Sequence, residues 1–174
     1  AIANIVRSIY IVILIPVQAL STTANTLVSN LIGSGGIDHV MHLMGRIAKV
    51  SFIIVLACVA LMVFLPEAAL SIYTNEPLLQ AESIPSLYVI GGAMLIASVA
   101  NIYFNGISGT GNTQAALYLE TGTLVIYALY VCWVGLILKA PVAVCFTTEA
   151  LYYGLLLLTS VIYLKKANWQ NKKI

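Results

Sequence analysis

Charged residues are scarce in this sequence. Of its 174 residues, eight are Lys or Arg and six are Asp or Glu, so charged types make up only 8%. A soluble domain carries about 25% charge, which would be roughly 43 residues in a chain of this length. So few charges cannot cover a core of this size with polar surface, and a water-soluble globular fold is excluded. The same scarcity excludes a disordered chain, which needs low hydrophobicity and high charge.

Sites built on cysteine, histidine or clustered basic residues are not indicated either. Cys58, Cys132 and Cys145 each lie alone in an apolar run, at spacings that fit neither a metal site nor a disulfide framework. His39 and His42 form an H-x-x-H without a neighbouring carboxylate or Cys ligand, so we expect a solvated loop there and no metal. The net charge of +2 is too small, and the basic residues too scattered, for a nucleic-acid surface.

Catalytic motifs are missing as well. The chain has no hydrolase nucleophile elbow, no H-E-x-x-H and no P-loop lysine. The polar side chains deep within its apolar segments are amides, hydroxyls and two separated carboxylates, Glu120 and Glu149. We therefore expect a protein that binds and releases its ligands, and not an enzyme.

Long apolar runs, in contrast, are abundant, and hydrophobic types make up 61% of the chain. A hydrocarbon core about 30 Å thick needs roughly 20 apolar residues in a helix. Five segments meet this requirement, and they are too long and too little alternating to be barrel strands. We predict an all-α integral membrane protein in which five transmembrane helices form one bundle over residues 1–174. The predicted spans are about 5–32, 47–65, 86–107, 113–138 and 141–164.

Glycine and proline mark several of the predicted ends. The first span stops at the glycine cluster of residues 33–36, and the second stops at Pro66. The third starts near Ser86, just after Pro85, and the fifth starts at Pro141, a favourable first-turn residue.

The loops predict an orientation. The tail after the fifth span is rich in lysine, with Lys165, Lys166, Lys172 and Lys173. The positive-inside rule places this end in the cytoplasm, and we expect a multi-pass protein of the inner (plasma) membrane. The loop 66–85, which holds three Glu and no Lys or Arg, is then outside, although Lys139 in the other outer turn disagrees. An odd number of spans and a first residue other than Met lead us to expect a piece of a longer protein.

Polar residues form stripes on four of the five spans, at helical spacings of three and four in the first and third, aligned in the fourth, and on a broader face in the fifth. They are Gln18, Thr22, Asn25 and Ser29; Ser98, Asn101, Asn105 and Ser108; Thr113, Glu120, Thr123 and Tyr127; and Glu149, Tyr152, Tyr153 and Ser160. Polar groups in hydrocarbon cost free energy unless they are paired or face a cavity. Bonds between helices would explain single Ser or Thr residues. Stripes on several helices together predict that these faces meet around a hydrated cavity.

Two carboxylates at depth are the sharpest signal. Glu120 lies about seven residues, or roughly 10 Å, inside its span, and Glu149 roughly 12 Å inside its own. An ionised carboxylate at such depth costs a few kcal/mol or more, so it must pair with a cation, line water or hold a proton. Arg7 is the only candidate cationic partner. Proton or cation binding is the favoured interpretation, and a protonated Glu that serves packing alone is the alternative.

The candidate residues for substrate and cation binding form one set, and no metal site is predicted among them. They are Glu120, Glu149, Asn101, Asn105, Gln18, Asn25, Ser98 and Tyr127.

Three short segments resemble one known family. Residues 26–35, TLVSNLIGSG, resemble the T-L-V-G-Q-x-x-G-x-G segment of MATE (multidrug and toxic compound extrusion) exporters. Residues 70–77, LSIYTNEP, resemble that family's outer loop before the tenth helix. Residues 109–113, GTGNT, resemble its G-A-G-D-T turn after that helix. The resemblance covers essentially the whole chain, with the three motifs in register.

This resemblance implies a fold and a mechanism. MATE proteins have twelve helices in two six-helix lobes, and the five spans would be helices eight to twelve, most of the C-terminal lobe. The implied partners are the N-terminal lobe of the same protein, small organic substrates and the bilayer. The implied function is antiport, in which H⁺ or Na⁺ runs inward while an amphipathic compound leaves as the lobes rock. No other cofactor is implied.

One segment departs from the family pattern. Many members carry an acidic residue midway along the tenth helix, whereas residues 96–99 here contain none. Coupling would then lie either in the N-terminal lobe or on Glu120 and Glu149.

Two other functions remain open. One is a lipid-linked oligosaccharide flippase of the same superfamily, although such flippases tend to line the cavity with Arg and Lys, which are missing here. The other is a membrane scaffold subunit that transports nothing, against which the polar stripes and the two carboxylates argue.

Overall fold

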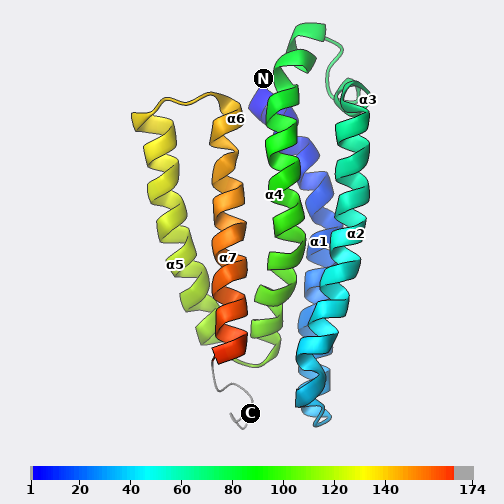
Figure 1. The fold of residues 1–174 in the computed structure, drawn as a ribbon, viewed down its shortest axis with the longest axis vertical. Helices are drawn as coiled ribbons and strands as arrows, with labels where there is room; N and C mark the ends of the chain where they lie inside the picture. Colours follow the sequence, from blue (N-terminus) through cyan, green and yellow to red (C-terminus); the bar gives the residue numbers. More distant parts are fainter. Residues whose placement is uncertain (1, 167–174) are drawn as a thin grey trace.

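The fold is a bundle of long helices, seen in a computed structural model that describes residues 2–166 (Figure 1). Lys172 and Lys173, used above for the orientation, lie outside the described residues. The elements are α1 (Ile2–Gly33), η1 (Ile37–His39), α2 (Val40–Phe64), α3 (Pro66–Ser71), α4 (Pro77–Gly109), α5 (Thr113–Cys132), η2 (Trp133–Ile137), α6 (Val142–Cys145) and α7 (Thr147–Lys166). Residues 2–166 contain no strand, and the predicted all-α class is confirmed.

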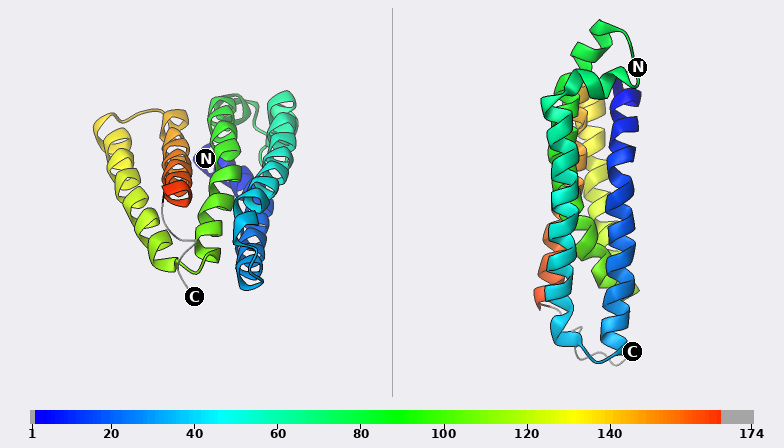
Figure 2. Two further views of the ribbon diagram at one scale, coloured as in Figure 1. Left: turned by 60° about the horizontal axis from the view of Figure 1, so that its bottom comes forward. Right: turned by 90° about the vertical axis from the view of Figure 1, so that its right-hand side faces the viewer.

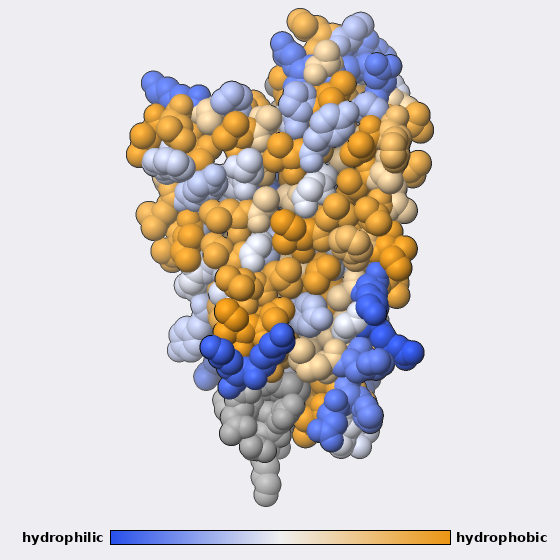
Figure 3. All heavy atoms as spheres, viewed as in Figure 1, coloured by the Kyte–Doolittle hydropathy of each residue, from blue (hydrophilic) through white to orange (hydrophobic). Residues whose placement is uncertain are grey.

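Within residues 2–166, five helical stretches are long and apolar enough to cross a membrane. They are Ile2–Gly33, Ile37–Phe64, Pro77–Gly109, Thr113–Ile137 and Val142–Lys166. Hydrophobic side chains dominate the middle of the bundle, and strongly hydrophilic ones gather at its two ends (Figure 3). This pattern is the one that a bilayer requires of a multi-pass protein.

The two ends of the bundle differ in charge. The end at which α1 finishes and α2 begins has Lys165 and Lys166 in the last turn of α7 and Arg46 and Lys49 in the first half of α2, and we call it the basic end (Figure 1). The opposite end, where α2 leads through α3 into α4, holds Glu67, Glu76 and Glu82, and we call it the acidic end.

Helix α4 is the centre of the bundle. It packs against α1 and α2 on one side and against α5 and α7 on the other (Figure 2). Half of the residues in its most apolar stretch are buried, against 11% in that of the Thr113–Ile137 span. Near its end a Cβ atom at Gly109 would lie 2.6 Å from the Asn25 carbonyl oxygen, so only glycine allows α1 to approach this closely. The Ser29 hydroxyl donates to the Gly109 carbonyl at 2.9 Å across the same contact.

Helix α4 begins at Pro77, well before the predicted span start near Ser86. Pro77 occupies the first turn, where its missing N–H leaves no helical bond unmade. The helix then continues through Pro85 at the loss of one backbone hydrogen bond. Buried residues on both sides of this proline, Ser83, Ser86 and Leu87, hold the helix in place by packing.

The fifth span is two helices, α6 and α7, with a break at Phe146. The hydroxyls of Thr147 and Thr148 donate to the carbonyls of Val144 and Cys145 at 2.6 and 2.7 Å. Such side-chain bonds to the preceding turn compete with the helical ladder and bend helices. As a result Glu149 lies in the first turn of α7 and not inside one continuous helix.

Candidate functional site

The carboxylate of Glu149 is held by tyrosine hydroxyls from two other helices. Tyr10 of α1 donates to its Oε2 at 3.3 Å, and Tyr127 of α5 donates to its Oε1 at 3.1 Å. The Tyr10 hydroxyl also lies 3.0 Å from that of Tyr153 in α7. A phenol has one proton, so Tyr10 donates to Glu149 and accepts from Tyr153. Glu149 thereby connects α1, α5 and α7.

A second layer of side chains surrounds these tyrosines. The ring of Tyr152 lies edge-on to those of Tyr127 and Tyr153, with centroids 5.5 and 5.1 Å apart. From α4, the Asn101 side chain lies close enough to the Tyr153 hydroxyl to interact with it. Its Nδ2 donates to the Ala97 carbonyl at 2.9 Å. The cluster is therefore built from four helices and contains three predicted candidates: Glu149, Tyr127 and Asn101.

Dipoles compensate the charge of Glu149. Within residues 2–166 the carboxylate makes no ion pair, and Arg7, the expected candidate partner, is exposed on α1. Two hydroxyl donors contact the carboxylate, and its place in the first turn of α7 puts it at the positive end of a helix dipole. A carboxylate held in this way has no competing cation to displace when a proton or metal cation arrives.

Glu120 lies on the same face of α5 as Tyr127, two turns away. The separation is about 10 Å along the helix, toward the basic end. Glu120 is partly buried, and within residues 2–166 it makes no hydrogen bond or ion pair. Both carboxylates act electrostatically on the Tyr152 hydroxyl. The structure thus aligns Glu120 and Glu149 along the α5–α7 contact, and no hydrogen bond joins them.

The remaining candidates lie outside the cluster. The Asn105 side chain donates to the Asn101 carbonyl at 2.9 Å, which continues the amide face of α4. Ser98 is fully buried, and its hydroxyl donates to the Leu95 carbonyl at 2.7 Å within the same helix. On α1, Gln18 is exposed and Asn25 partly buried, and neither bonds to the Glu149 cluster. The residue by which α1 reaches the cluster is Tyr10.

Sequence reasoning left Tyr10, Tyr152 and Tyr153 out of the candidate set. The two α7 tyrosines follow Glu149 within four residues, so their place on a common helix face was available as a signal. Tyr10 is 139 residues from Glu149, and no local pattern pairs them.

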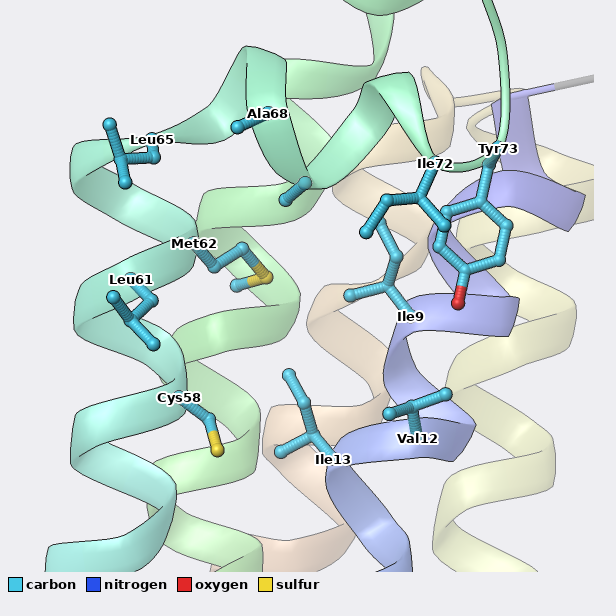
Figure 4. A pocket seen from close by; sticks show the side chains of 11 residues that line it. Ile9, Val12, Ile13, Cys58, Leu61, Met62, Leu65, Ala68, Ile72 and Tyr73 are labelled. Atoms are coloured by element: carbon cyan, nitrogen blue, oxygen red, sulfur yellow. The ribbon is translucent and has the colours of Figure 1, made fainter.

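A separate, apolar groove opens at the acidic end, between α1, α2 and α3 (Figure 4). Its volume is about 420 Å³. Among its lining residues, only Tyr73 has a side-chain oxygen, and none has a side-chain nitrogen. Ile9 and Ile13 of α1 face this groove, whereas the neighbouring Tyr10 bonds to α7. The groove has no charged lining residue and is distinct from the Glu149 cluster. Across residues 2–166, no group of three or more His, Cys, Asp or Glu is placed to hold a metal ion.

Comparison with known proteins gives one match. No curated protein and no solved structure matches this chain. The family model MatE matches residues 1–144, a range that includes all three segments in which the sequence resembles MATE exporters. With most of its length matched and five helices able to cross a membrane, the chain belongs to the MatE family of membrane efflux transporters, which are not enzymes.

Proposed function

We propose that the protein containing this chain is a cation-coupled antiporter, which exports amphipathic organic compounds while H⁺ or Na⁺ moves inward. One observation carries the proposal. The Glu149 carboxylate is bound by hydroxyls of Tyr10 and Tyr127 from two other helices, without a counter-cation among residues 2–166. The coupling ion takes the place of that missing cation.

Loading the site requires little rearrangement. A proton on Glu149 turns the carboxyl group into a donor toward one of the tyrosine oxygens. A Na⁺ ion instead uses oxygen ligands, and the carboxylate and the phenol oxygens of Tyr10 and Tyr127 are of that kind. Either ion replaces hydroxyl-to-carboxylate hydrogen bonds that tie α1 and α5 to α7. Occupancy therefore biases how the three helices pack, which is the link between ion binding and conformation that an antiporter needs.

Glu120 provides a second position at which the coupling ion can bind. It lies about 10 Å from Tyr127 along α5, on the side of the basic end. The hydroxyl of Tyr152 interacts electrostatically with both carboxylates. We assign Glu120 to passage of the ion and Glu149 to its binding.

The substrate cavity is proposed to lie between this bundle and an N-terminal lobe of the same protein. Gln18 belongs to the polar stripe of α1, is exposed on the bundle surface, and its side chain makes no hydrogen bond among residues 2–166. An exposed amide at membrane depth needs a partner surface or water. A lobe facing this stripe across a hydrated cavity provides both, with the basic end in the cytoplasm of a cell whose inner (plasma) membrane holds the protein.

The test is transport by the purified protein in proteoliposomes, driven by an imposed pH or Na⁺ gradient with a fluorescent organic cation as substrate. Glu149→Gln keeps the shape of the side chain and removes its charge. Hydrogen bonds to a charged group contribute about 1.5–3 kcal/mol, so gradient-driven export is expected to fall by about tenfold or more. Glu67→Gln, at an exposed carboxylate of α3, is the matched control and should export normally. Normal export by Glu149→Gln under both gradients would make this carboxylate a packing residue.

A further inference from the structure

A second cavity, far from Glu149, opens at the basic end between the last turns of α1 and the first turns of α2. Its volume is about 660 Å³, within the range of ordinary ligand sites. Its polar lining residues are Asn30, Ser34, His39, His42 and Arg46. His42 and Arg46 are four residues apart on α2 and share one face of that helix. The histidine pair seen in the sequence thus belongs to a cavity and not to a featureless loop.

The ionisable groups that line this cavity are all basic. Arg46 carries a fixed positive charge, and each imidazole of His39 and His42 offers at least one N–H donor. Asp38, the carboxylate nearest in sequence, does not line the cavity. Across residues 2–166, no hydrogen bond or ion pair engages the side chains of Asn30, His39, His42 or Arg46. Several donors therefore converge on one space, and no protein acceptor satisfies them.

The other wall of the cavity is apolar. Leu27, Leu31 and Leu43 line it, and Leu27 lies about 9 Å along α1 from the end of that helix. Arg46 lies at a similar depth in α2, about 9 Å from the start of that helix, so the cavity brings basic and apolar side chains together at one level of the bundle. A ligand that fills it has an anionic head and an apolar body.

We propose that this cavity is a binding site for an anionic phospholipid. The Arg46 guanidinium takes the phosphate through two parallel N–H donors, a geometry that Arg provides better than Lys. His39, His42 and Asn30 add further donors, and an acyl chain lies along the three leucines. Basic pockets between helices at one membrane face favour anionic headgroups in general, and the leucine wall selects a lipid over free phosphate. This inference does not depend on what the protein exports.

Native mass spectrometry of the purified protein tests the proposal. The protein in detergent is mixed with phosphatidylglycerol or with phosphatidylcholine of the same acyl chains, and retained lipid is counted. The parent is expected to retain phosphatidylglycerol preferentially. The double variant Arg46→Gln, His42→Gln should retain at least about fivefold less, because one Arg near an anionic lipid contributes a factor of this size and the His42 donor is lost as well. Both residues are exposed, so the variant keeps its packing, and an unchanged thermal unfolding temperature verifies this.

The matched control is Lys165→Gln, Lys166→Gln, which removes two charges from the same end of the bundle outside this cavity. It should retain phosphatidylglycerol as the parent does. Equal retention by all three proteins, or equal retention of both lipids by the parent, would overturn the proposal. Displacement of the lipid by inorganic phosphate at equal concentration would overturn the lipid assignment and leave a phosphate site.

Discussion

At Glu149 a negative charge inside a membrane bundle is balanced by dipoles and not by a basic side chain. Tyr10 and Tyr127 donate to its two oxygens, and the first turn of α7 adds the partial charge of a helix end. A buried Arg or Lys would bind the carboxylate permanently, since breaking such a pair costs about 3–5 kcal/mol. Hydroxyl donors cost much less to reorient. Under the proposed function, this difference lets the coupling ion bind to and leave the same carboxylate.

The contribution of one hydroxyl can be measured with Tyr127→Phe. The variant keeps the ring that packs edge-on against Tyr152 and removes the donor to Oε1 of Glu149. A hydrogen bond to a charged group contributes about 1.5–3 kcal/mol. The concentration of the coupling ion that gives half-maximal export should therefore shift by about tenfold or more. Tyr118→Phe, at a tyrosine of α5 that is 74% exposed, is the control and should leave export unchanged. Equal behaviour of the two variants would show that the Tyr127 hydroxyl has no part in ion binding.

At the scale of elements, helix α4 organises the bundle because small residues let its neighbours approach. The clearest case is its last residue, Gly109, where the backbone of α1 occupies the space of a side chain. The turn that follows has Gly111 at φ 78°, a conformation that favours glycine. Asn112 then caps α5 through the Ala115 N–H and donates to the Tyr163 hydroxyl of α7. The GTGNT segment noted in the sequence thus holds α1, α4, α5 and α7 together at one end.

Gly109→Ala should therefore destabilise the bundle. The added Cβ would lie 2.6 Å from a backbone oxygen of α1, which cannot move aside as a flexible side chain can. Overpacking of this kind costs about 1–3 kcal/mol, which should appear as a lower unfolding temperature of the purified protein in detergent. Gly92→Ala in the same helix is the matched control, because a Cβ there has no neighbour within 4 Å. An unfolding temperature for Gly109→Ala at or above that of Gly92→Ala would refute this account of the α1–α4 contact.

The whole molecule is polarised along the membrane normal. Its basic end carries Arg46, Lys49, Lys165 and Lys166, and its acidic end carries Glu67, Glu76 and Glu82. The bias of Lys and Arg toward cytoplasmic loops predicts that the basic end faces the cytoplasm. Lys139 lies at the opposite end and is outnumbered there.

Cysteine labelling measures this orientation. In a background where Cys58, Cys132 and Cys145 are replaced by Ala, Asn75→Cys should react in intact cells with a membrane-impermeant maleimide. Asp38→Cys should react only after the cells are permeabilised. Both positions are exposed, so accessibility differs only by side of the membrane. Labelling of Asp38→Cys in intact cells would reverse the topology and move the proposed lipid site to the outer leaflet.

Sequence patterns by themselves determined the features that depend on composition or on one helix. The scarcity of charge and the five apolar runs identified an all-α membrane bundle, and three short motifs identified the family. Glu149 and Glu120 stood out because a carboxylate inside an apolar run is locally anomalous.

Only the tertiary structure decided which faces meet. The contact between Tyr10 and Glu149 and the cavity that joins Asn30 of α1 to Arg46 of α2 follow from packing between helices. In a soluble protein, a polar outer face would have marked the buried face of each helix. In a membrane both the lipid and the bundle interior are apolar, so hydrophobicity along a helix does not say which face packs inward. The pairing of Tyr10 with Glu149 was therefore decided where α1 and α7 come together, and no stretch of sequence contains both.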